Sequence, residues 1–393
     1  GNRPVRSHSR IAAARLIMTH AGDADLLMKT VEILEGVITD SGSERDQVAE
    51  AMLLKADIYA ALGSSENVIP AYEAVIRQYG DVRQWTDTAV ERILDLAVRG
   101  PGAEALSDRV RILRKIFEDN RESVPVLAMG ALNRVGDTYY RADEWAEAKS
   151  AYRQVLDTFP EVTTQTAAAR LALAEILYRE ERFREALDLY QAEIGTRGRN
   201  DRIFQLARDG YIRKSVAAGE YLLSLGEVPA AMSRFKSLMD YDDTIIEAHR
   251  GYIRCAAALR EISRVQAMYE ARLKADPHDS VALYGTALTL TYRETAETLD
   301  RSRSLLMEAI RADGRVGYFH QTLGYVQEVL ETVHGREGLL PSALAAYQRA
   351  WFLNDAATNP DNAAHLALNI GNIHFLLGQY GDALEYYLRR LDR

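Results

Sequence analysis

The sequence predicts an all-α protein built from consecutive pairs of helices. First, Ala, Leu, Glu and Arg are abundant, whereas the 393 residues include only 9 prolines, a composition that favours helix almost throughout. Second, apolar residues recur at helical spacing, without an alternating strand pattern of useful length. Third, a motif of small, aromatic and helix-stopping residues recurs along the chain. Because a single hydrophobic core stops growing beyond roughly 250–300 residues, we expect the pairs to stack in a row.

The amino-terminal residues predict an arm followed by a loose helical pair. Residues 1–10 carry three arginines, no acidic residue and little apolar content, which is typical of a mobile basic arm. Such an arm either stays solvated or contacts anionic lipid or nucleic acid, and we favour the solvated arm because three arginines are few. Residues 11–20 and 24–38 keep helical spacing, and a terminal pair is expected to be irregular because it has a neighbour on only one side.

Two further irregular pairs complete an amino-terminal region over residues 11–123. Residues 46–62 and 68–79 form the first of them, and residues 83–98 and 103–118 form the second. In the second pair a Gly-Pro-Gly turn separates the helices, because Gly and Pro end any helix there. The amphipathic pattern is clear in both pairs although the recurring motif is weak.

The clearest pair spans residues 129–162, with helices predicted at 129–141 and 144–158. Small residues, Gly136 and Ala148, stand where the two helices would have to touch, and a Phe-Pro step closes the unit. Large apolar and aromatic residues surround them at helical spacing. These are Leu132, Val135, Tyr139, Trp145, Tyr152 and Val155.

This unit resembles the tetratricopeptide repeat, a helix-turn-helix motif of about 34 residues. Its Gly136, Tyr139, Ala148, Tyr152 and Pro160 fall where that family has small, aromatic, small, aromatic and helix-stopping residues. The resemblance implies a right-handed superhelix. The helical pattern gives about nine or ten pairs over nearly the whole chain.

The pattern continues to the carboxyl terminus, so we expect residues 124–393 to form the main solenoid. One connector, at residues 332–341, is longer than the usual 2–8 residues or so. It is either a loop that contacts a partner or tolerated drift, and we favour drift. The further helices are predicted at 166–178 and 183–194, 203–225 and 228–239, 245–259 and 262–275, 280–292 and 299–312, 317–333 and 341–353, and 362–377 and 381–391.

The final predicted helix carries an apolar stripe that no following element covers. Leu384, Leu388 and Leu391 lie at helical spacing on it, whereas a solenoid normally ends in a polar capping helix. Either the chain was cut before its cap, or this end packs on another molecule such as a second copy. We favour truncation.

Composition argues against several classes of function. The net charge of −9, with both signs interspersed, argues against nucleic acid as the main partner, which usually needs a basic face. The single cysteine, Cys255, excludes an intramolecular disulfide and a multi-cysteine metal site. We expect it to be a small buried residue. No run of 18 apolar residues occurs, so no transmembrane segment is predicted.

The sequence carries no motif of a known catalytic site. A Gly-rich phosphate loop followed by Lys and Ser or Thr does not occur, and neither does an HExxH pair. His365 and His374 are spaced so that they do not share one helix face. Adjacent acids such as Asp242 and Asp243 lie at helix ends, where capping is their default role. We therefore predict a non-enzymatic protein with no catalytic residue, no cofactor and no metal.

The inner face of the solenoid is the strongest candidate for a binding surface. In proteins similar to this one, the first helix of every pair lines a concave groove, and the second faces outward. On such a face Asn and Gln can pair with a peptide backbone, Arg with carboxylates, and Tyr supplies contact area. The alternative for each residue is an ordinary solvated or packing role. The predicted groove residues are Asn133, Asp137, Tyr140, Arg141, Glu175, Tyr178, Arg179, Glu220, Tyr318, Gln321, Tyr325, His365, Asn372 and Phe375.

The charge of these residues indicates which ligand the groove prefers. The family's known clamp of Lys, Arg and Asn for an acidic chaperone tail is not matched, because Asn133 and Asn369 are isolated. Asp137, Glu175 and Glu220 instead make the central groove acidic. An acidic groove favours a ligand that carries Arg or Lys.

The spacing and sequence of the repeats suggest a cellular location. Residues 71–81 and 151–178 are similar to repeats of bacterial envelope proteins, namely those associated with the Tol system, outer-membrane assembly lipoproteins and exopolysaccharide-export scaffolds. The resemblance implies a periplasmic or envelope-associated protein, with a lipoprotein tether before Gly1 as one form. A cytoplasmic location is the alternative.

Three hypotheses for function follow from the sequence. The first is an adaptor that holds a peptide or protein segment in its groove within a multiprotein assembly. The second is the sensory or regulatory region of a larger enzyme. The third is a self-assembling scaffold whose last helix docks on another copy.

Overall fold

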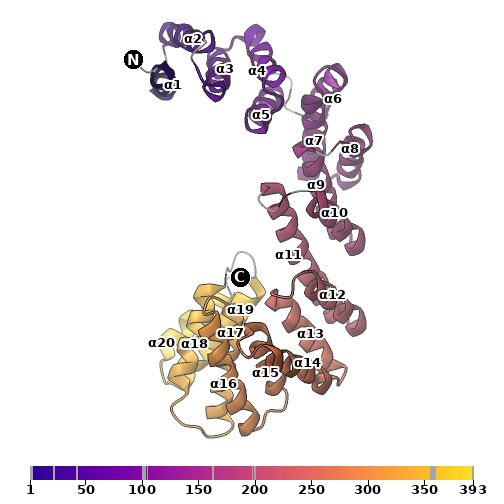
Figure 1. Cartoon of the computed structure of the whole chain (residues 1–393), viewed down its shortest axis with the longest axis vertical. Helices are drawn as coiled ribbons and strands as arrows, with labels where there is room; N and C mark the ends of the chain where they lie inside the picture. Colours follow the sequence, from indigo (N-terminus) through magenta and orange to yellow (C-terminus); the bar gives the residue numbers. More distant parts are fainter. Residues whose placement is uncertain are drawn as a thin grey trace. The chain divides into compact units, whose positions relative to one another are not determined.

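The chain folds into helices throughout the part that the structure describes. The computed structural model describes residues 3–20, 23–40, 43–99, 103, 105–161, 163–196, 198, 201–354 and 360–391. These residues form twenty α-helices and no strand (Figure 1). The predicted all-α class is confirmed, and the helices group into ten consecutive pairs, within the predicted nine or ten.

The helices belong to two compact units, residues 1–211 and residues 212–393, which divide within α11 (Arg202–Ser224). The helices of the first unit before α11 are α1 (Arg3–His20), α2 (Ala24–Ile38), α3 (Arg45–Ala61), α4 (Ser65–Gln78), α5 (Arg83–Arg99), α6 (Leu106–Asn120), α7 (Pro125–Arg141), α8 (Trp145–Thr158), α9 (Thr164–Arg179) and α10 (Phe183–Thr196). Those of the second unit after α11 are α12 (Val228–Tyr241), α13 (Ile246–Ala258), α14 (Ile262–Ala275), α15 (Ser280–Thr291), α16 (Ala296–Ala312), α17 (Gly317–Thr332), α18 (Leu340–Leu353), α19 (Pro360–Leu376) and α20 (Tyr380–Leu391).

The expected division between residues 11–123 and 124–393 does not coincide with this boundary. One hydrophobic core runs from Ala49 in α3 to Ala186 in α10 and passes through the expected boundary. Within it, the rings of Phe117 and Phe159 meet edge to face with their centroids 6.4 Å apart. The boundary expected at residue 123 thus lies inside this core, and a smaller core holds α1, α2 and α3.

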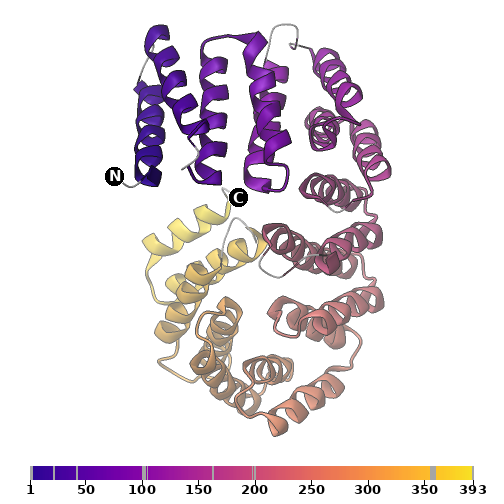
Figure 2. The ribbon, with the colours of Figure 1, turned by 45° about the horizontal axis from the view of Figure 1, so that its top comes forward.

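Packing between helices distinguishes an inner from an outer layer in each unit. Every helix from α1 to α9 packs on the next one, and α1, α3, α5, α7 and α9 also contact one another in succession. In the second unit α13, α15 and α17 do the same. Even-numbered helices of the described part make no comparable contacts with each other. The first helices are thus the more closely spaced, inner layer. Figure 2 shows the helices near the amino terminus, in indigo and purple, standing side by side.

Small residues let the aromatic side chains of the second helices lie against the first helices. A Cβ atom added to Gly136 in α7 would lie 2.4 Å from Cε1 of Tyr152 in α8, so only glycine leaves room for the ring. Ala148 is fully buried beside it. The predicted contact of small and aromatic residues is confirmed. It recurs within pairs at Gly219 with Phe235, Gly324 with Tyr347, and Gly371 with Tyr387, and between successive pairs at Gly251 with Phe235 and Gly285 with Tyr269.

A left-handed residue reverses the chain between the two helices of many pairs. It lies two residues after the end of the first helix, where a positive φ lets the chain turn back. Glycine occupies this place at Gly63, Gly226 and Gly378, with φ between 67° and 79°. Residues with side chains occupy it at Asp143, Glu181 and Arg260, with φ between 59° and 61°.

Residues 3–10, which the sequence predicted as part of a mobile basic arm, form the first turns of α1. The Ser7 side chain is buried, and its hydroxyl lies 2.8 Å from that of Ser43. Arg10 Nη1 donates to the carbonyl of Gly36 at 3.4 Å. Hydrogen bonds from Ser7 and Arg10 to later residues therefore hold this polar segment in place. Residues 1 and 2 lie outside the described residues.

Hydrogen bonds to the α15–α16 pair and to α17 hold the long connector between α17 and α18. His334 Nε2 donates to the Glu294 carbonyl at 2.9 Å, and Arg336 donates to Asp300 at 3.0 Å. Glu331 accepts from the backbone N–H groups of Leu339 and Leu340, at 2.5 and 2.6 Å. The connector thus ties α17 to the α15–α16 pair.

The last helical pair exposes a large apolar area. Phe375 and Leu376 of α19 and Tyr380, Leu384 and Leu388 of α20 have exposed fractions of 49–66%. Leu384 and Leu388 belong to the stripe that the sequence predicted. The side chain of Leu391 lies outside the described residues.

Candidate partner-binding surface

An aromatic and arginine cluster forms where the inner helices α7 and α9 end. The Arg179 guanidinium carbon lies 5.3 Å from the ring centre of Tyr140 and 5.8 Å from that of Trp145. Its Nε is 3.9 Å from a Glu175 carboxylate oxygen. A guanidinium above an aromatic face is attracted by the negative face of the ring. Four residues from three helices thus meet, and we call Tyr140, Trp145, Glu175 and Arg179 the aromatic–arginine cluster.

Tyr178 lies beside this cluster but serves mainly to pack the α9–α10 pair. Its ring lies 5.0 Å from that of Phe183, with the two planes tilted by 56°. Burial and the nearby Glu175 carboxylate raise the pKa of Tyr178 to about 12. The hydroxyl therefore stays protonated at physiological pH. Tyr178 is half-buried, and it is less accessible than its predicted role in a groove requires.

Asn133 is not available to a partner, contrary to the prediction. It is buried, and its Nδ2 donates to the Gln165 backbone carbonyl at 2.8 Å and to the Gln165 side-chain oxygen at 3.0 Å. A buried amide needs hydrogen-bond partners, and here they come from the next inner helix. Asn133 therefore joins α7 to α9.

Three of the predicted polar groove residues accept hydrogen bonds from tyrosines of the second helix in the same pair. Tyr152 donates to Asp137 at 2.7 Å, Tyr190 to Glu175 at 3.5 Å, and Tyr387 to Asn372 at 3.0 Å. Each tyrosine follows its acceptor by 15 residues. This spacing is the signal that would have assigned these residues to packing. Tyr72 donates to Asp57 at the same spacing.

Each of the carboxylates expected to make the groove acidic, Asp137, Glu175 and Glu220, has a hydroxyl or arginine partner. A hydroxyl leaves the charge of its carboxylate in place, whereas an arginine offsets it. In the second unit Arg254 Nη1 donates to both Glu220 oxygens at 2.6 and 2.8 Å. In the first unit Arg92 lies 3.5 Å from Asp57. Arg134 lies 3.0 Å from Asp95 and also pairs with Glu91.

These ion pairs connect neighbouring inner helices and were missed by sequence reasoning. Asp57, Arg92 and Arg134 belong to α3, α5 and α7, and each arginine lies about one repeat after its acidic partner. An acid and an arginine separated by one repeat length would have indicated such a pair. The pairs are partly solvent-exposed, so each contributes roughly 0–1 kcal/mol.

The inner face of the second unit carries a smaller aromatic and arginine group. The Arg250 guanidinium carbon of α13 lies 4.9 Å from the ring centre of Tyr318 in α17. Tyr318 and Gln321 are buried, so neither presents more than an edge to a partner. Tyr325 is partly exposed, and its hydroxyl donates to Glu294 at 3.4 Å. Arg250 was not among the predicted groove residues.

In α19 only part of the predicted set is exposed. Asn372 is bound to Tyr387, whereas Phe375 is exposed and meets Tyr380 edge to face at 5.5 Å. His365 is also exposed. Phe375 thus belongs to the apolar area of the last pair.

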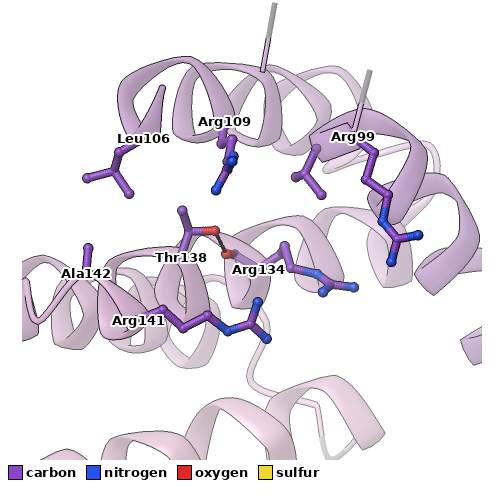
Figure 3. A pocket seen from close by; sticks show the side chains of 8 residues that line it. Arg99, Leu106, Arg109, Arg134, Thr138, Arg141 and Ala142 are labelled. Carbon is purple, nitrogen blue, oxygen red and sulfur yellow. Dashed lines mark hydrogen bonds between the residues drawn. The ribbon is translucent and has the colours of Figure 1, made fainter. Parts of the chain in front are cut away.

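Arg141 lines a pocket between α5, α6 and α7, apart from the aromatic–arginine cluster (Figure 3). Three other arginines line the same pocket, and none of them was predicted. Only Arg141 lay on the helix face that the prediction considered.

Other sites of chemistry can be assessed within the described residues. Cys255 is buried, as predicted, and burial raises the pKa of its thiol to about 11. No group of three or more His, Cys, Asp or Glu residues in the described part is arranged to hold a metal ion. Among the described helices, none combines the length and the apolar character needed to cross a membrane.

Comparison with known proteins identifies the motif of the central helices. Residues 127–194, which cover most of α7 to α10, match the tetratricopeptide repeat family. No curated protein sequence matches the chain.

Several solved structures are similar to this chain at low identity. A thermophilic tetratricopeptide repeat protein from Thermus thermophilus is 17% identical, covers 46% of this chain and 90% of its own, and has a TM-score of 0.35. A tetratricopeptide repeat protein from Parabacteroides merdae is 12% identical, with coverages of 70% and 95% and a TM-score of 0.36. The Cut9–Hcn1 hetero-tetramer of the APC/C is 12% identical, with coverages of 96% and 85% and a TM-score of 0.36.

Proposed function

Because the chain carries tetratricopeptide repeats, we propose that it is a non-catalytic scaffold that holds a segment of a partner protein on its inner helices. Stacked repeats of this kind generally present an extended surface for protein interaction. The inner layer of the first unit, made by α3, α5, α7 and α9, is the part of that surface where we place the partner.

The aromatic–arginine cluster is the single observation that carries this proposal. Tyr, Trp and Arg dominate the energetics of protein interfaces when they are clustered and already ordered. Here the Arg179 guanidinium contacts two aromatic rings while its side chain remains 47% exposed. A guanidinium in this position needs little reordering to contact a partner, which lowers the entropic cost of binding.

Replacing the cluster tests the proposal. The double variant Tyr140→Ala, Arg179→Ala should lose partner capture from native extract by at least tenfold, and helicity by circular dichroism should stay unchanged. A photo-cross-linking residue placed at position 140 should yield a cross-linked partner.

The matched control uses the outer helix of the same pair. Arg153 of α8 is exposed and lies on the outer layer, so Arg153→Ala should leave capture intact. A cross-linker at position 153 should give no product. Equal capture by the two variants, or equal cross-linking from the two positions, would show that the inner face is not the binding surface.

A second candidate function is association between copies through the last helical pair. The exposed residues Phe375, Tyr380, Leu384 and Leu388 form an apolar area of the kind that marks interaction sites. Mass measured by light scattering should rise with concentration, and Leu384→Glu with Leu388→Glu should keep the protein monomeric. A monomeric mass at high concentration contradicts this candidate.

Two broader proposals rest on the sequence alone. The spacing and sequence of the repeats support an envelope location. Fractionation of the parent cell tests this location against the cytoplasmic alternative. The other alternative, a regulatory region of a larger enzyme, is tested by reading the parent gene beyond Arg393, where a prompt stop codon argues against it.

A further inference from the structure

A pocket of about 360 Å³ lies between the end of α5, the start of α6 and the end of α7 (Figure 3). Arg99 comes from the last turn of α5, and Arg109 from the first turns of α6. Arg134 and Arg141 both lie on α7, together with Thr138 between them. The remaining walls are Val98, Leu106 and Ala142. Among the described residues, the lining thus contains four guanidinium groups and no carboxylate.

The four arginines differ in whether carboxylate or carbonyl groups of the protein already bind them. Arg134 pairs with Glu91 and Asp95, and Arg99 lies 3.7 Å from Asp95. These two carboxylates of α5 therefore offset part of the charge.

The other two arginines are less engaged. Arg109 donates from Nε to the Ala103 carbonyl at 2.8 Å. Within the described residues Arg141 has neither an ion pair nor a hydrogen bond from its side chain, and it is exposed. Among the described residues at the pocket, positive charge therefore exceeds negative charge, in a chain whose net charge is −9.

Basic residues at the ends of α5 and α7 can be explained without a ligand. Helix C-termini favour Lys and Arg because the last carbonyl groups are partly negative. That preference explains Arg99 and Arg141 separately. It does not explain Arg109, which lies near the start of a helix, where a positive charge is disfavoured, or Arg134, which lies in the middle of α7. Convergence from three helices is the feature that points to a ligand.

We propose that this pocket binds a phosphate monoester carried by a side chain of the partner segment. Guanidinium groups form paired N–H···O bonds to phosphate, and several of them around one site match its several oxygens and double charge. The pocket has room for more than the phosphate group, and Val98 and Leu106 provide apolar walls for the linking carbons. This inference rests on the proposed function, since it describes one contact of the same partner.

The direct test uses defined peptides and needs no knowledge of the partner. Three peptides of one Gly-Ser background carry phosphoserine, glutamate or serine at the central position, and binding is measured by calorimetry. The phosphoserine peptide should bind at least tenfold more tightly than the serine peptide, and added salt should weaken it. A glutamate peptide that binds as well would overturn the choice of phosphate and identify a carboxylate as the source of the oxyanion.

Substitutions of the pocket arginines test whether the phosphate binds in this pocket. Arg99→Gln with Arg141→Gln should reduce phosphopeptide affinity by at least tenfold, and both side chains extend from helix ends, so folding should be retained. Arg153→Gln on α8 is the control and should leave affinity unchanged. Failure of the phosphopeptide to bind at millimolar concentration, or equal affinity in the pocket variant and the control, overturns the proposal.

Failure of the phosphate proposal can be distinguished from failure of the inner-face proposal. Tyr140→Ala with Arg179→Ala should keep its affinity for the phosphopeptide, because the aromatic–arginine cluster does not line the pocket. The pocket variant should lose phosphopeptide binding and also capture the partner more weakly, because the phosphate belongs to the same partner. Unchanged partner capture by the pocket variant would overturn that assignment without affecting the proposal for the inner face.

Discussion

At the scale of single residues, the contact between Gly136 and Tyr152 shows why each repeat tolerates little change. A methyl group on Gly136 would overlap the buried ring, and such overpacking costs about 1–3 kcal/mol. Gly136→Ala should therefore lower the unfolding free energy measured in urea. The outcome is informative because alanine normally stabilises a helix relative to glycine.

The control is Gly195 in α10, where an added Cβ atom meets nothing within 4 Å. Gly195→Ala should raise stability by up to about 1 kcal/mol through helix propensity. Opposite signs at the two glycines would support ring contact as the cause. The same sign at both would contradict it.

His249 makes the stability of the second unit depend on pH. The residue is buried, with Nε2 2.8 Å from the Asp243 carbonyl and Nδ1 2.7 Å from the Tyr269 hydroxyl. A carbonyl only accepts, so Nε2 carries the proton and Nδ1 accepts from Tyr269. Burial, and to a smaller extent the charge of Arg272, lower the pKa of His249 below its ordinary value of 6.5, while Asp243 and Asp279 raise it.

The sign of the pH effect follows from proton binding. Below pH 6.5 the unfolded chain binds a proton at position 249, whereas the folded chain does so only at lower pH, so stability falls as the solution is acidified. Urea midpoints at about pH 7.5 and 5.5, which lie on either side of the ordinary histidine pKa, should differ less for His249→Gln than for the wild type. His320, whose pKa burial also lowers, adds to the slope of both proteins. Equal slopes would show that His249 contributes nothing.

At the scale of helices, the turn between the two members of a pair contains removable strain. Arg260 adopts a φ of 61° at a place where other repeats have glycine. A left-handed conformation costs a residue with a side chain roughly 1–2 kcal/mol, and glycine avoids this cost. Arg260→Gly should therefore raise the melting temperature, despite the greater flexibility of glycine in the unfolded chain.

The converse change serves as the control for this turn. Gly226 has a φ of 79° in the equivalent place, and nothing lies within 4 Å of an added Cβ atom. Gly226→Ala should lower the melting temperature through backbone strain alone. A rise for Gly226→Ala, or a fall for Arg260→Gly, would show that conformational strain is not what limits these turns.

Sequence patterns predicted the helices far better than the roles of their polar side chains. Helix positions follow from local periodicity, and the close contact of Gly136 with Tyr152 follows from a motif within one pair. Asp137 and Glu175 looked available because periodicity places a residue on a face without naming its partner. Their tyrosine partners come from the following helix, and the partner of Ser7 in α1 comes from the connector between α2 and α3.

At the scale of the whole molecule, contacts confined to neighbouring repeats make damage local. Among the described helices, α7 packs on α5, α6, α8 and α9. Leu132→Ala removes a fully buried side chain from α7 and should cost about 2–5 kcal/mol. Hydrogen exchange should accelerate in α5 to α9, while α15 to α18 keep their protection.

The reciprocal variant tests the same idea from the second unit. Phe319 of α17 is fully buried, and Phe319→Ala should accelerate exchange in α15 to α18 but leave α5 to α9 unchanged. Uniform loss of protection along the chain in either variant would show that the chain unfolds as one cooperative block, contrary to the behaviour of a stack of repeats.

The same pattern of contacts has a consequence for how the chain reaches its fold. In the described part of the chain, the main contacts of each helix are with helices that adjoin it or lie next but one in sequence, so folding closes mostly short loops. Proteins with such local contacts fold quickly, because little chain entropy is lost before each contact forms. During synthesis, each helix pair can pack on the one before it as soon as it emerges from the ribosome. Chain growth and folding can therefore advance together, one repeat at a time.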